Sequence, residues 1–392
     1  MSKAPFTVRE YATRLRAVYA MMDREGIDTL LLTDPCSIVW ISGYDAWSFY
    51  VPQALVVSPN LPEPLWVGRR IDVPCVGFTS WLSADSVVAY ADDVVQIAGR
   101  NPAQFIAEEV KRRGLGRGAI GLELDSFYLT PRYRDCLVDA LADARWADIG
   151  LKLARLRSVK SPAELEVMRQ AAAIVERSMR TALDHVRVGA RESDVAGEIA
   201  RAQTAGTEQF SGFHISSPIY LLRGKRGAAP HITWGEGRFQ RDETAYMELM
   251  GCRYRYQVTV SRSVHFGRPP DAVRNAAEAS QAGIEAALET ARPGQTCGDV
   301  ARAMLKAFAG YGIEKQTRCG YAIGIAYPPT SGERTMSLHP ADETPLEAGM
   351  TFHVHPNLLF QDWGLYITES MVVTPDGGEP FTTLPRELVV RD

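Results

Sequence analysis

Apolar and polar residues follow two different periods along the chain. Apolar side chains recur at helical spacing over residues 7–25, and the predicted buried face comprises Tyr11, Leu15, Val18, Tyr19 and Met22. Short apolar runs such as DTLLLTD, PLWVG, SVVAYA and AIGLELD are typical of buried strands. Helical stretches such as AQFIAEEVKRRG separate them. This alternation over residues 1–150 predicts a small α/β domain.

A strong helix start marks the end of this first domain. Ser161 provides an N-cap, Pro162 fits the first turn, and Glu164 follows three residues after the cap. The sequence therefore predicts a boundary near residue 155, with domains at 1–155 and 156–392. Long helices are expected in the second domain at 162–185, 191–205, 270–291 and 297–310.

Alternating segments of the second domain predict antiparallel strands with one face toward a cavity. These segments are AYMELMGCRYRYQVTVSRSVHFG, GMTFHVHPNLLF and LYITESMVV. Together with the long helices they indicate an α+β domain.

Composition narrows the class of protein. The chain has 392 residues, 46% of them apolar, and a net charge of −4 without a long basic or acidic block. Such a balance does not favour recruitment to nucleic acid or to a membrane surface. The N-terminus lacks the pattern of a signal peptide, and no apolar run is long enough to span a bilayer. Six scattered cysteines without a CxxC pair are typical of reduced thiols, so we expect a cytoplasmic protein.

Several polar residues of the second domain could carry chemistry. Glu248 lies in an otherwise apolar strand, where a carboxylate is costly unless it is paired or used. His353 and His355 stand at i and i+2 of a strand-like run and would share a face. Such a pair could bind one metal ion, face a substrate, or be structural. The other candidates are His231, Tyr321, Arg334 and Glu369.

The order of these pieces resembles a known superfamily. The phrase R-x-x-K-S-x-x-E-x-x-x-x-R-x-A, from Arg157 to Ala171, resembles the opening of the pita-bread fold. That fold belongs to methionine aminopeptidases, prolidases and creatinases, which form peptidase family M24. The resemblance implies an α+β pita-bread C-terminal domain. An α/β domain before it is the creatinase and prolidase arrangement.

Metallopeptidases of this superfamily bind two divalent ions with two Asp, one His and two Glu side chains. By motif, those positions fall in this chain on Glu248, Thr259, Tyr321, His355 and Glu369. Thr and Tyr are poor ligands for such ions at neutral pH, so we expect no metal cofactor. An Xaa-Pro peptidase is correspondingly less favoured.

A closer resemblance, extending through both domains, is to ectoine hydrolases. GYDAWSFYVPQ (43–53), APHITW and SGERTMSL follow the pattern of that group in order. Ser261 replaces a Glu of creatinase, which argues against creatine as the substrate. MELMG, Gln257-Val258-Thr259 and His353-Val354-His355 depart from the ectoine hydrolase pattern. The resemblance implies metal-independent opening of the cyclic amidine of ectoine, or of hydroxyectoine, to N-acetyl-diaminobutyrate.

The resemblance also suggests roles for individual residues. Glu248 would attack the amidine carbon or activate water, Glu369 would hold the amidinium, and His231 would shuttle the proton. Substrate contacts are expected from Tyr321, Arg334, His353 and His355. An aromatic wall of Trp47, Phe49 and Tyr50 would come from the N-terminal domain of the other subunit, which implies a homodimer. A pathway deacetylase would be a functional partner.

Three alternatives stay open. The substrate could be another small cyclic amidine, lactam or guanidino compound, or the chain could be an Xaa-Pro peptidase with an altered metal site. The third alternative is a binding protein without catalytic activity. A pure binding module has no physical need for His231, Glu248 and Glu369 together, which favours an enzyme.

Overall fold

The computed structural model describes residues 4–392. The chain divides into two compact units, Met1–Arg157 and Ser158–Asp392, two residues beyond the predicted boundary. Among the described residues, no helix is both long and apolar enough to cross a membrane.

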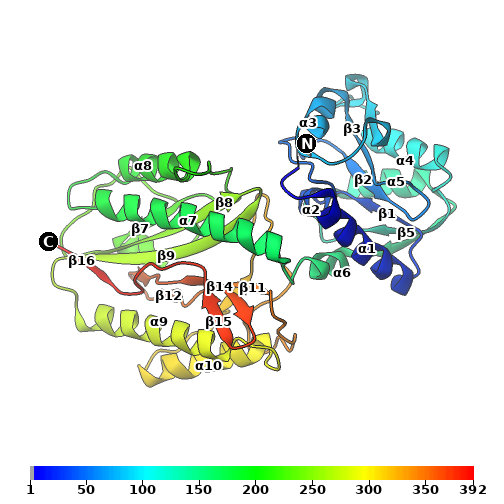
Figure 1. The fold of residues 1–392 in the computed structure, drawn as a ribbon. Coiled ribbons are helices and arrows are strands. Elements are labelled where there is room, and N and C mark those ends of the chain that lie inside the picture. The colour runs from blue at the N-terminus through cyan, green and yellow to red at the C-terminus, as the bar shows by residue number, and fades with distance from the viewer. Residues whose placement is uncertain (1–3) are drawn as a thin grey trace. The chain divides into compact units, whose positions relative to one another are not determined.

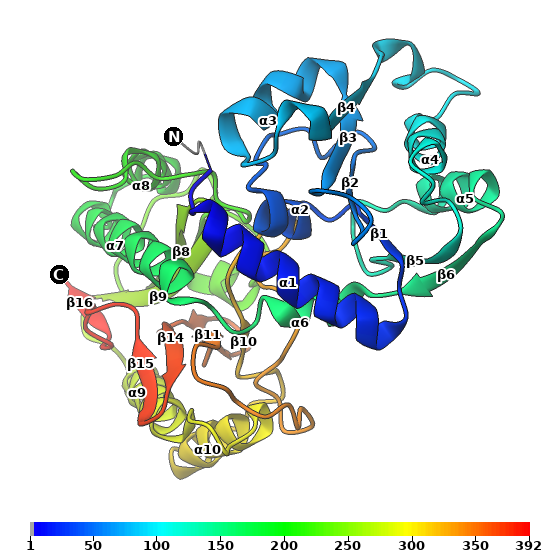
Figure 2. The ribbon, with the colours of Figure 1, turned by 45° about the vertical axis from the view of Figure 1, so that its right-hand side comes forward.

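The N-terminal unit is built on one mixed sheet of six strands (Figures 1 and 2). The strand order is β4 (Val87–Tyr90), β3 (Leu65–Arg69), β2 (Ala54–Val57), β1 (Thr29–Leu32), β5 (Gly118–Leu122) and β6 (Ala144–Asp148). The β2 strand runs antiparallel to both β1 and β3, whereas the β3–β4, β1–β5 and β5–β6 pairs are parallel. Four of these strands, β1, β3, β4 and β5, were predicted from short apolar runs.

Helices cover both faces of this sheet. Apolar residues of α4 and α5, such as Ile106 and Leu137, pack against Leu31, Val56 and Val67 of the sheet. Figure 2 shows α1 and α2 on the other side. The helices are α1 (Val8–Glu25), α2 (Pro35–Ser42), α3 (Val73–Thr79), α4 (Pro102–Arg112), α5 (Pro131–Ala140) and α6 (Gly150–Leu156), with short 3₁₀ turns η1 (Arg70–Asp72), η2 (Ala84–Ser86) and η3 (Asp92–Val94).

The C-terminal unit holds two four-stranded sheets and a two-stranded ribbon. The first sheet has the order β16 (Val389–Arg391), β9 (Tyr256–Phe266), β8 (Thr244–Arg253) and β7 (Tyr220–Arg223). The second has the order β10 (Gly320–Ala322), β11 (Thr351–Val354), β14 (Glu369–Thr374) and β15 (Gly377–Pro380). The ribbon pairs β12 (Leu358–Leu359) with β13 (Gly364–Leu365).

The four predicted long helices of this unit are all present. They are α7 (Pro162–His185), α8 (Glu192–Ala205), α9 (Asp271–Thr290) and α10 (Cys297–Gly310), and a 3₁₀ turn η4 (Gly224–Ala228) follows β7. Figure 1 shows α7 and α8 beside the first sheet and α9 and α10 beside the second. The strands therefore lie between two helix pairs, which is the arrangement that the resemblance to a pita-bread fold implied.

Local sequence explains how the central hairpin is positioned. Ser161 and Glu164 form a reciprocal capping box that starts α7 at Pro162. The β8–β9 hairpin closes with Tyr254 and Arg255, whose φ angles of 47° and 68° match a two-residue type I′ turn. The register places Glu248 opposite Ser261. Every residue of β8 from Thr244 to Cys252 is buried, so this hairpin forms the centre of the unit.

Candidate active site

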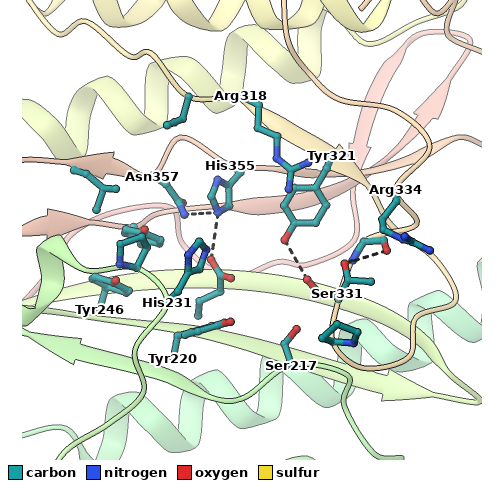
Figure 3. Close-up of a pocket in the computed structure, with 18 residues that line it drawn as sticks. Ser217, Tyr220, His231, Tyr246, Arg318, Tyr321, Ser331, Arg334, His355 and Asn357 are labelled. Carbon is teal, nitrogen blue, oxygen red and sulfur yellow. Dashed lines mark hydrogen bonds and ion pairs between the residues drawn. The ribbon is translucent and has the colours of Figure 1, made fainter. Parts of the chain in front are cut away.

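A cavity of about 540 Å³ lies in the C-terminal unit. Its walls come from β7, β8 and β10, from the loops before β8 and after β10, and from the segment between β11 and β14 (Figure 3). The polar and aromatic side chains that line it are Ser217, Tyr220, His231, Tyr246, Glu248, Thr317, Arg318, Tyr321, Thr330, Ser331, Arg334, His355, Asn357 and Tyr366. Four residues with predicted substrate or catalytic roles besides Glu248 are therefore brought together here.

Glu248 supplies the one carboxylate among the described residues that line this cavity. Its Oε2 accepts a hydrogen bond from Ser261 Oγ at 3.1 Å and lies 3.5 Å from His355 Nε2. Burial alone would raise the pKa of Glu248, but the hydrogen bond and charge of His355, aided by Ser261, lower that pKa to about 2. The carboxylate is therefore ionised at neutral pH.

His355 completes this acid–base pair. Burial lowers the pKa of the His355 imidazole, and the neighbouring Glu248 offsets part of that effect. The side-chain amide of Asn357 also contacts the Nε2 atom of His355. Figure 3 shows His355 and Asn357 side by side on one wall of the cavity. The pair thus places a partner of adjustable protonation directly beside the Glu248 carboxylate.

A buried chain of hydrogen bonds reaches Glu248 from the other side. His353 Nδ1 lies 3.0 Å from the Tyr321 hydroxyl, and His353 Nε2 lies 2.7 Å from Thr368 Oγ1. Thr368 Oγ1 donates to Ser261 Oγ at 3.1 Å, and Ser261 donates to Glu248. Because each hydroxyl has one proton, Thr368 must accept from His353 Nε2–H, and His353 Nδ1 must accept from Tyr321. All four bonds run in one direction, toward the carboxylate.

His353 therefore has a different position from the one that its sequence spacing suggested. The side chain is 0% exposed and does not line the cavity. Burial lowers the pKa of His353 to about 3, so the ring is neutral and has the single tautomer that the chain of hydrogen bonds requires. Tyr321 reaches the cavity, whereas His353 holds it from behind. The predicted contact between His353 and a substrate has no geometric basis here.

Glu369 also lies behind the wall. Its carboxylate is 0% exposed and accepts hydrogen bonds from Thr382 Oγ1 at 2.9 and 3.0 Å and from the Ser370 amide at 3.0 Å. Arg262 Nη2 and Arg386 Nε lie 3.7 and 3.6 Å from it. Burial raises the pKa of Glu369 to about 7, and Arg262 opposes that rise. These contacts explain the residue structurally without a substrate.

His231 and Arg334 line the cavity from two loops. The loop that carries His231 is anchored by Glu192, which is 1% exposed. Glu192 accepts from the Gly235 amide at 2.5 Å and from Arg223 Nε at 2.7 Å. Arg334 has a φ of 55°, in the left-handed region that few non-glycine residues occupy.

The predicted aromatic wall belongs to the N-terminal unit. The Trp47 and Phe49 ring centroids lie 4.8 Å apart, and Phe49 contacts Tyr128 edge to face at 5.4 Å. Trp47 and Tyr50 are 53% and 62% exposed. Their contact with a substrate stays a prediction.

Sequence reasoning missed an aromatic pair and a cation. The rings of Tyr246 and Tyr366 stack with centroids 3.9 Å apart and an interplanar angle of 5°. Tyr246 is two residues before Glu248 on β8, so the two-residue period of the strand could have predicted that both side chains share a face. Arg318 lies in the loop before β10, where no period indicates which way a side chain points.

The side chains at the metal-binding positions of M24 peptidases do not fit a two-metal centre. Thr259 and Tyr321 occupy two of those positions, and the guanidinium groups of Arg262 and Arg386 lie beside Glu369, where they would repel a divalent cation. Within residues 4–392, no group of three or more His, Cys, Asp or Glu side chains is arranged to hold a metal ion.

Comparison with known proteins places both units in families. Residues 14–159 match the Creatinase/Prolidase N-terminal domain, and residues 166–375 match metallopeptidase family M24. The chain is 40% identical to ectoine hydrolase of Halomonas elongata over 99% of this chain and 98% of that enzyme. An Xaa-Pro dipeptidase of Lactobacillus helveticus is 28% identical over 93% of this chain and 95% of that enzyme.

Solved structures show the same architecture. Dipeptidase PepE from Mycobacterium ulcerans superposes with a TM-score of 0.80 at 25% identity, covering 98% of this chain and 99% of that one. Prolidase from Thermococcus sibiricus superposes with a TM-score of 0.83 at 18% identity, covering 97% and 99%. The predicted pita-bread unit with a creatinase-type N-terminal domain is thereby confirmed. The chain belongs to metallopeptidase family M24, as a creatinase/prolidase-type hydrolase of carbon–nitrogen bonds that is similar to ectoine hydrolase over nearly its whole length.

Proposed function

We propose that this chain opens the cyclic amidine ring of ectoine, or of hydroxyectoine, by adding water without the help of a metal ion. The observation that carries the proposal is the ionised Glu248 carboxylate in a cavity of about 540 Å³. Ectoine is a six-membered amidinium ring that bears a carboxylate. A cavity of this size accommodates such a small ring, and its buried anion complements the amidinium charge.

Recognition of the amidinium would use charge and stacking together. The Glu248 carboxylate accepts from the N–H groups of the ring as a charge-assisted hydrogen bond. The stacked Tyr246 and Tyr366 rings offer an aromatic face to a planar cation. Arg334, Tyr321 and His355 line the same cavity and would contact the substrate and the intermediate.

The chemistry would proceed through attack on the amidine carbon. A pKa of about 2 keeps Glu248 ionised, so that it attacks the carbon directly or activates a water that does. In the direct route the bonds change as follows. The attack forms a C–O bond, and the ring C–N bond then breaks as His231 protonates the leaving nitrogen. Water hydrolyses the enzyme-bound intermediate and releases Glu248. The product carries one acetamide and one free amine, as in N-acetyl-diaminobutyrate.

Glu369 takes a supporting role in this proposal. Its hydrogen bond to the Ser370 amide fixes the residue whose hydroxyl donates to the Thr259 carbonyl at 2.7 Å. Arg262, beside Glu369, donates to the Thr368 carbonyl at 2.8 Å. Glu369 thereby stabilises the strands that hold the chain of hydrogen bonds to Glu248.

The decisive test is ring opening by protein that has been treated with EDTA. Conversion of ectoine to an N-acetylated product, followed by NMR without added metal, is the expected result. A folded protein that leaves ectoine and hydroxyectoine intact would contradict the proposal. Activity that appears only with Mn²⁺ and Xaa-Pro dipeptides would instead support the peptidase alternative.

One observation favours a second candidate, a related small cyclic amidine or lactam. His355 departs from the ectoine hydrolase pattern and lies directly on Glu248, and Asn357 contacts it. These groups add polarity at the reacting centre, which a ring with a further hydroxyl or carbonyl could use. Parallel assays of ectoine, hydroxyectoine and a six-membered lactam separate the candidates by kcat/KM.

The partners follow from the same proposal. A homodimer would let Trp47, Phe49 and Tyr50 of one subunit face a substrate in the other. Light scattering measures the dimer, and mixing inactive W47A and E248Q proteins should restore activity if the sites are shared.

The N-acetylated product requires a deacetylating hydrolase as the next step. We propose that ring opening and the following deacetylation both take place in the cytoplasm.

A further inference from the structure

Among the described residues that line the cavity, Arg318 is the permanently charged one that neither the sequence motifs nor the proposed chemistry uses. It lines the cavity, it is exposed, and it forms no ion pair with any residue in the range 4–392. Guanidinium groups bind carboxylates through paired hydrogen bonds, and no acid of the described residues engages this one. This arrangement suggests a ligand anion as the missing partner.

The Arg318 side chain is nonetheless held in one place, over the ring of Tyr321. Its guanidinium carbon lies 4.5 Å from the centroid of the Tyr321 ring. Tyr321 cannot shift easily, because its hydroxyl is bonded to the buried His353 at 3.0 Å. On the other side, a Cβ placed on Gly332 would lie 2.8 Å from Tyr321 Cδ2, so the loop backbone is packed against the ring. A guanidinium held over this fixed aromatic ring keeps its N–H donors free for a ligand. Because the side chain is already ordered, it loses little conformational entropy when a ligand binds.

Charge is separated across the cavity. Figure 3 shows Arg318 and Tyr321 on one wall, with Tyr220 and Ser217 on the opposite wall. Glu248 comes from β8, which pairs with β7 through Tyr220 and Glu248 themselves. The carboxylate thus comes from the first sheet, and the guanidinium comes from the loop before β10 of the second sheet. A small zwitterion can contact both charges at once.

We propose that Arg318 is a specificity residue that binds the carboxylate of a zwitterionic substrate, while Glu248 takes its cationic ring. This inference rests on the proposed function and extends it, because it assigns one end of the substrate to a residue outside the recognised motifs. Arg334 also lines the cavity but makes contacts of its own within the chain. Arg318, by contrast, forms no ion pair with the described residues, so its guanidinium is open to a ligand.

The test compares ectoine with 2-methyl-1,4,5,6-tetrahydropyrimidine, which has the same amidine ring and no carboxylate. The kcat/KM ratio of the two substrates is measured for the wild type, R318Q and R318K. The preference for ectoine should fall at least tenfold in R318Q, mainly through KM, and less in R318K, which keeps the charge but not the fork. R292Q, which changes an exposed arginine in the loop before α10, is the matched control and should keep the wild-type ratio.

Two outcomes overturn the assignment. If the kcat/KM ratio of the two substrates is unchanged in R318Q, Arg318 does not bind the carboxylate. This holds whether the variant is equally slower with both substrates or unchanged with both. If the wild type hydrolyses neither compound, the proposed function fails and binding decides the matter. Titration calorimetry should then still show ectoine binding more tightly than the analogue in the wild type, with the difference lost in R318Q. Equal binding of both compounds would overturn the role of Arg318 as well.

Discussion

The chemistry at the residue scale depends on how one buried carboxylate keeps its charge. Glu248 is 7% exposed, and burial alone disfavours its ionised form. The His355 imidazole and the Ser261 hydroxyl reverse that effect. Ser261 comes from the neighbouring strand of the same hairpin, whereas His355 comes from a segment distant in the sequence. The carboxylate is consequently ionised at neutral pH, as the proposed chemistry requires.

Substituting E248Q should abolish turnover with little change in fold. The amide keeps the size and the Ser261 contact but loses the negative charge, so we expect kcat to fall by a factor of about 10³ or more. Activity is followed by NMR of ring opening, and folding by circular dichroism and Tm. The control is E285Q, an exposed glutamate on α9. Retained activity in E248Q would remove this residue from the mechanism.

Removing His355 should make activity sensitive to acid. In H355Q, the imidazole no longer opposes the effect of burial on Glu248. The pKa of Glu248 then rises from about 2 to above that of an ordinary glutamate. A raised pKa means that the ionised form is lost sooner as the pH falls. The acid limb of kcat/KM should therefore move to higher pH than in the wild type, measured between pH 4.5 and 8. H339Q, at an exposed histidine, should keep the wild-type profile.

At the scale of elements, the β8–β9 hairpin determines the site because two other layers contact it. Helix α7 packs on β8 from one side, and the second sheet meets β9 through β14 and β11 on the other. Glu248 comes from β8, Ser261 from β9 and His353 from β11, and Thr368 directly precedes β14. A chain of hydrogen bonds across these strands requires all of them in register.

Breaking this chain at Thr368 should slow catalysis without removing any group that lines the cavity. T368V deletes the hydroxyl between His353 and Ser261 and leaves a buried N–H unpaired, at a cost of about 1–3 kcal/mol in the free energy of unfolding. We expect kcat to fall about tenfold as Ser261 and Tyr321 lose their orientation. T368S retains the hydroxyl and should stay near the wild type. Equal kinetics for T368V and T368S would mean that the chain of hydrogen bonds has no role in turnover.

The close packing of α7 on β8 should depend on Gly251. A Cβ at this position would lie 2.0 Å from the Ala171 carbonyl oxygen and 2.7 Å from the Val175 amide. G251A therefore forces the helix away, and we expect a loss of more than about 2 kcal/mol in the free energy of unfolding. G197A, inside α8 with nothing within 4 Å of its Cβ, should be neutral or stabilising by about 1 kcal/mol. Chemical denaturation of both variants measures the contrast.

At the scale of the whole molecule, buried acids link stability to pH. Burial raises the pKa of Glu369 in the C-terminal unit to about 7, and burial, followed by the charge of Asp34, raises that of Glu123 in the N-terminal unit to about 7. A carboxyl whose pKa is higher in the folded state stabilises that state at low pH. Its contribution is complete below the unfolded pKa and is lost as the pH rises through the folded value.

The contribution of Glu369 to stability should therefore be lost between about pH 5 and pH 8, so E369Q should lose less stability over that range than the wild type. A rise from 4.5 to about 7 corresponds to a contribution of about 3 kcal/mol at most. Denaturant unfolding of both proteins at several pH values measures how the free energy of unfolding changes with pH. This comparison does not depend on the absolute stability of E369Q. Identical slopes would indicate that Glu369 is ionised throughout, held by Arg262 and Arg386.

The sequence by itself determined the elements and the family. The four long helices of the C-terminal unit lie within one residue of their predicted bounds, because caps and periodic apolar faces are local signals. Glu248 could be identified for the same reason, since a carboxylate in an apolar strand is conspicuous. Helix α2, by contrast, was missed because its eight residues are almost all buried and show no amphipathic period.

Only the tertiary structure decided which of the candidate side chains reach the cavity. His353 and His355 were expected to share a face, but β11 ends at Val354, so the strand period no longer applies to His355. Glu369 is surrounded by Arg262, Arg386 and Thr382, partners that no local pattern predicts. Arg318 was invisible because a loop residue has no period. Local periods set which side chains are buried, whereas packing between distant segments sets whether a buried polar group meets a ligand or the protein itself.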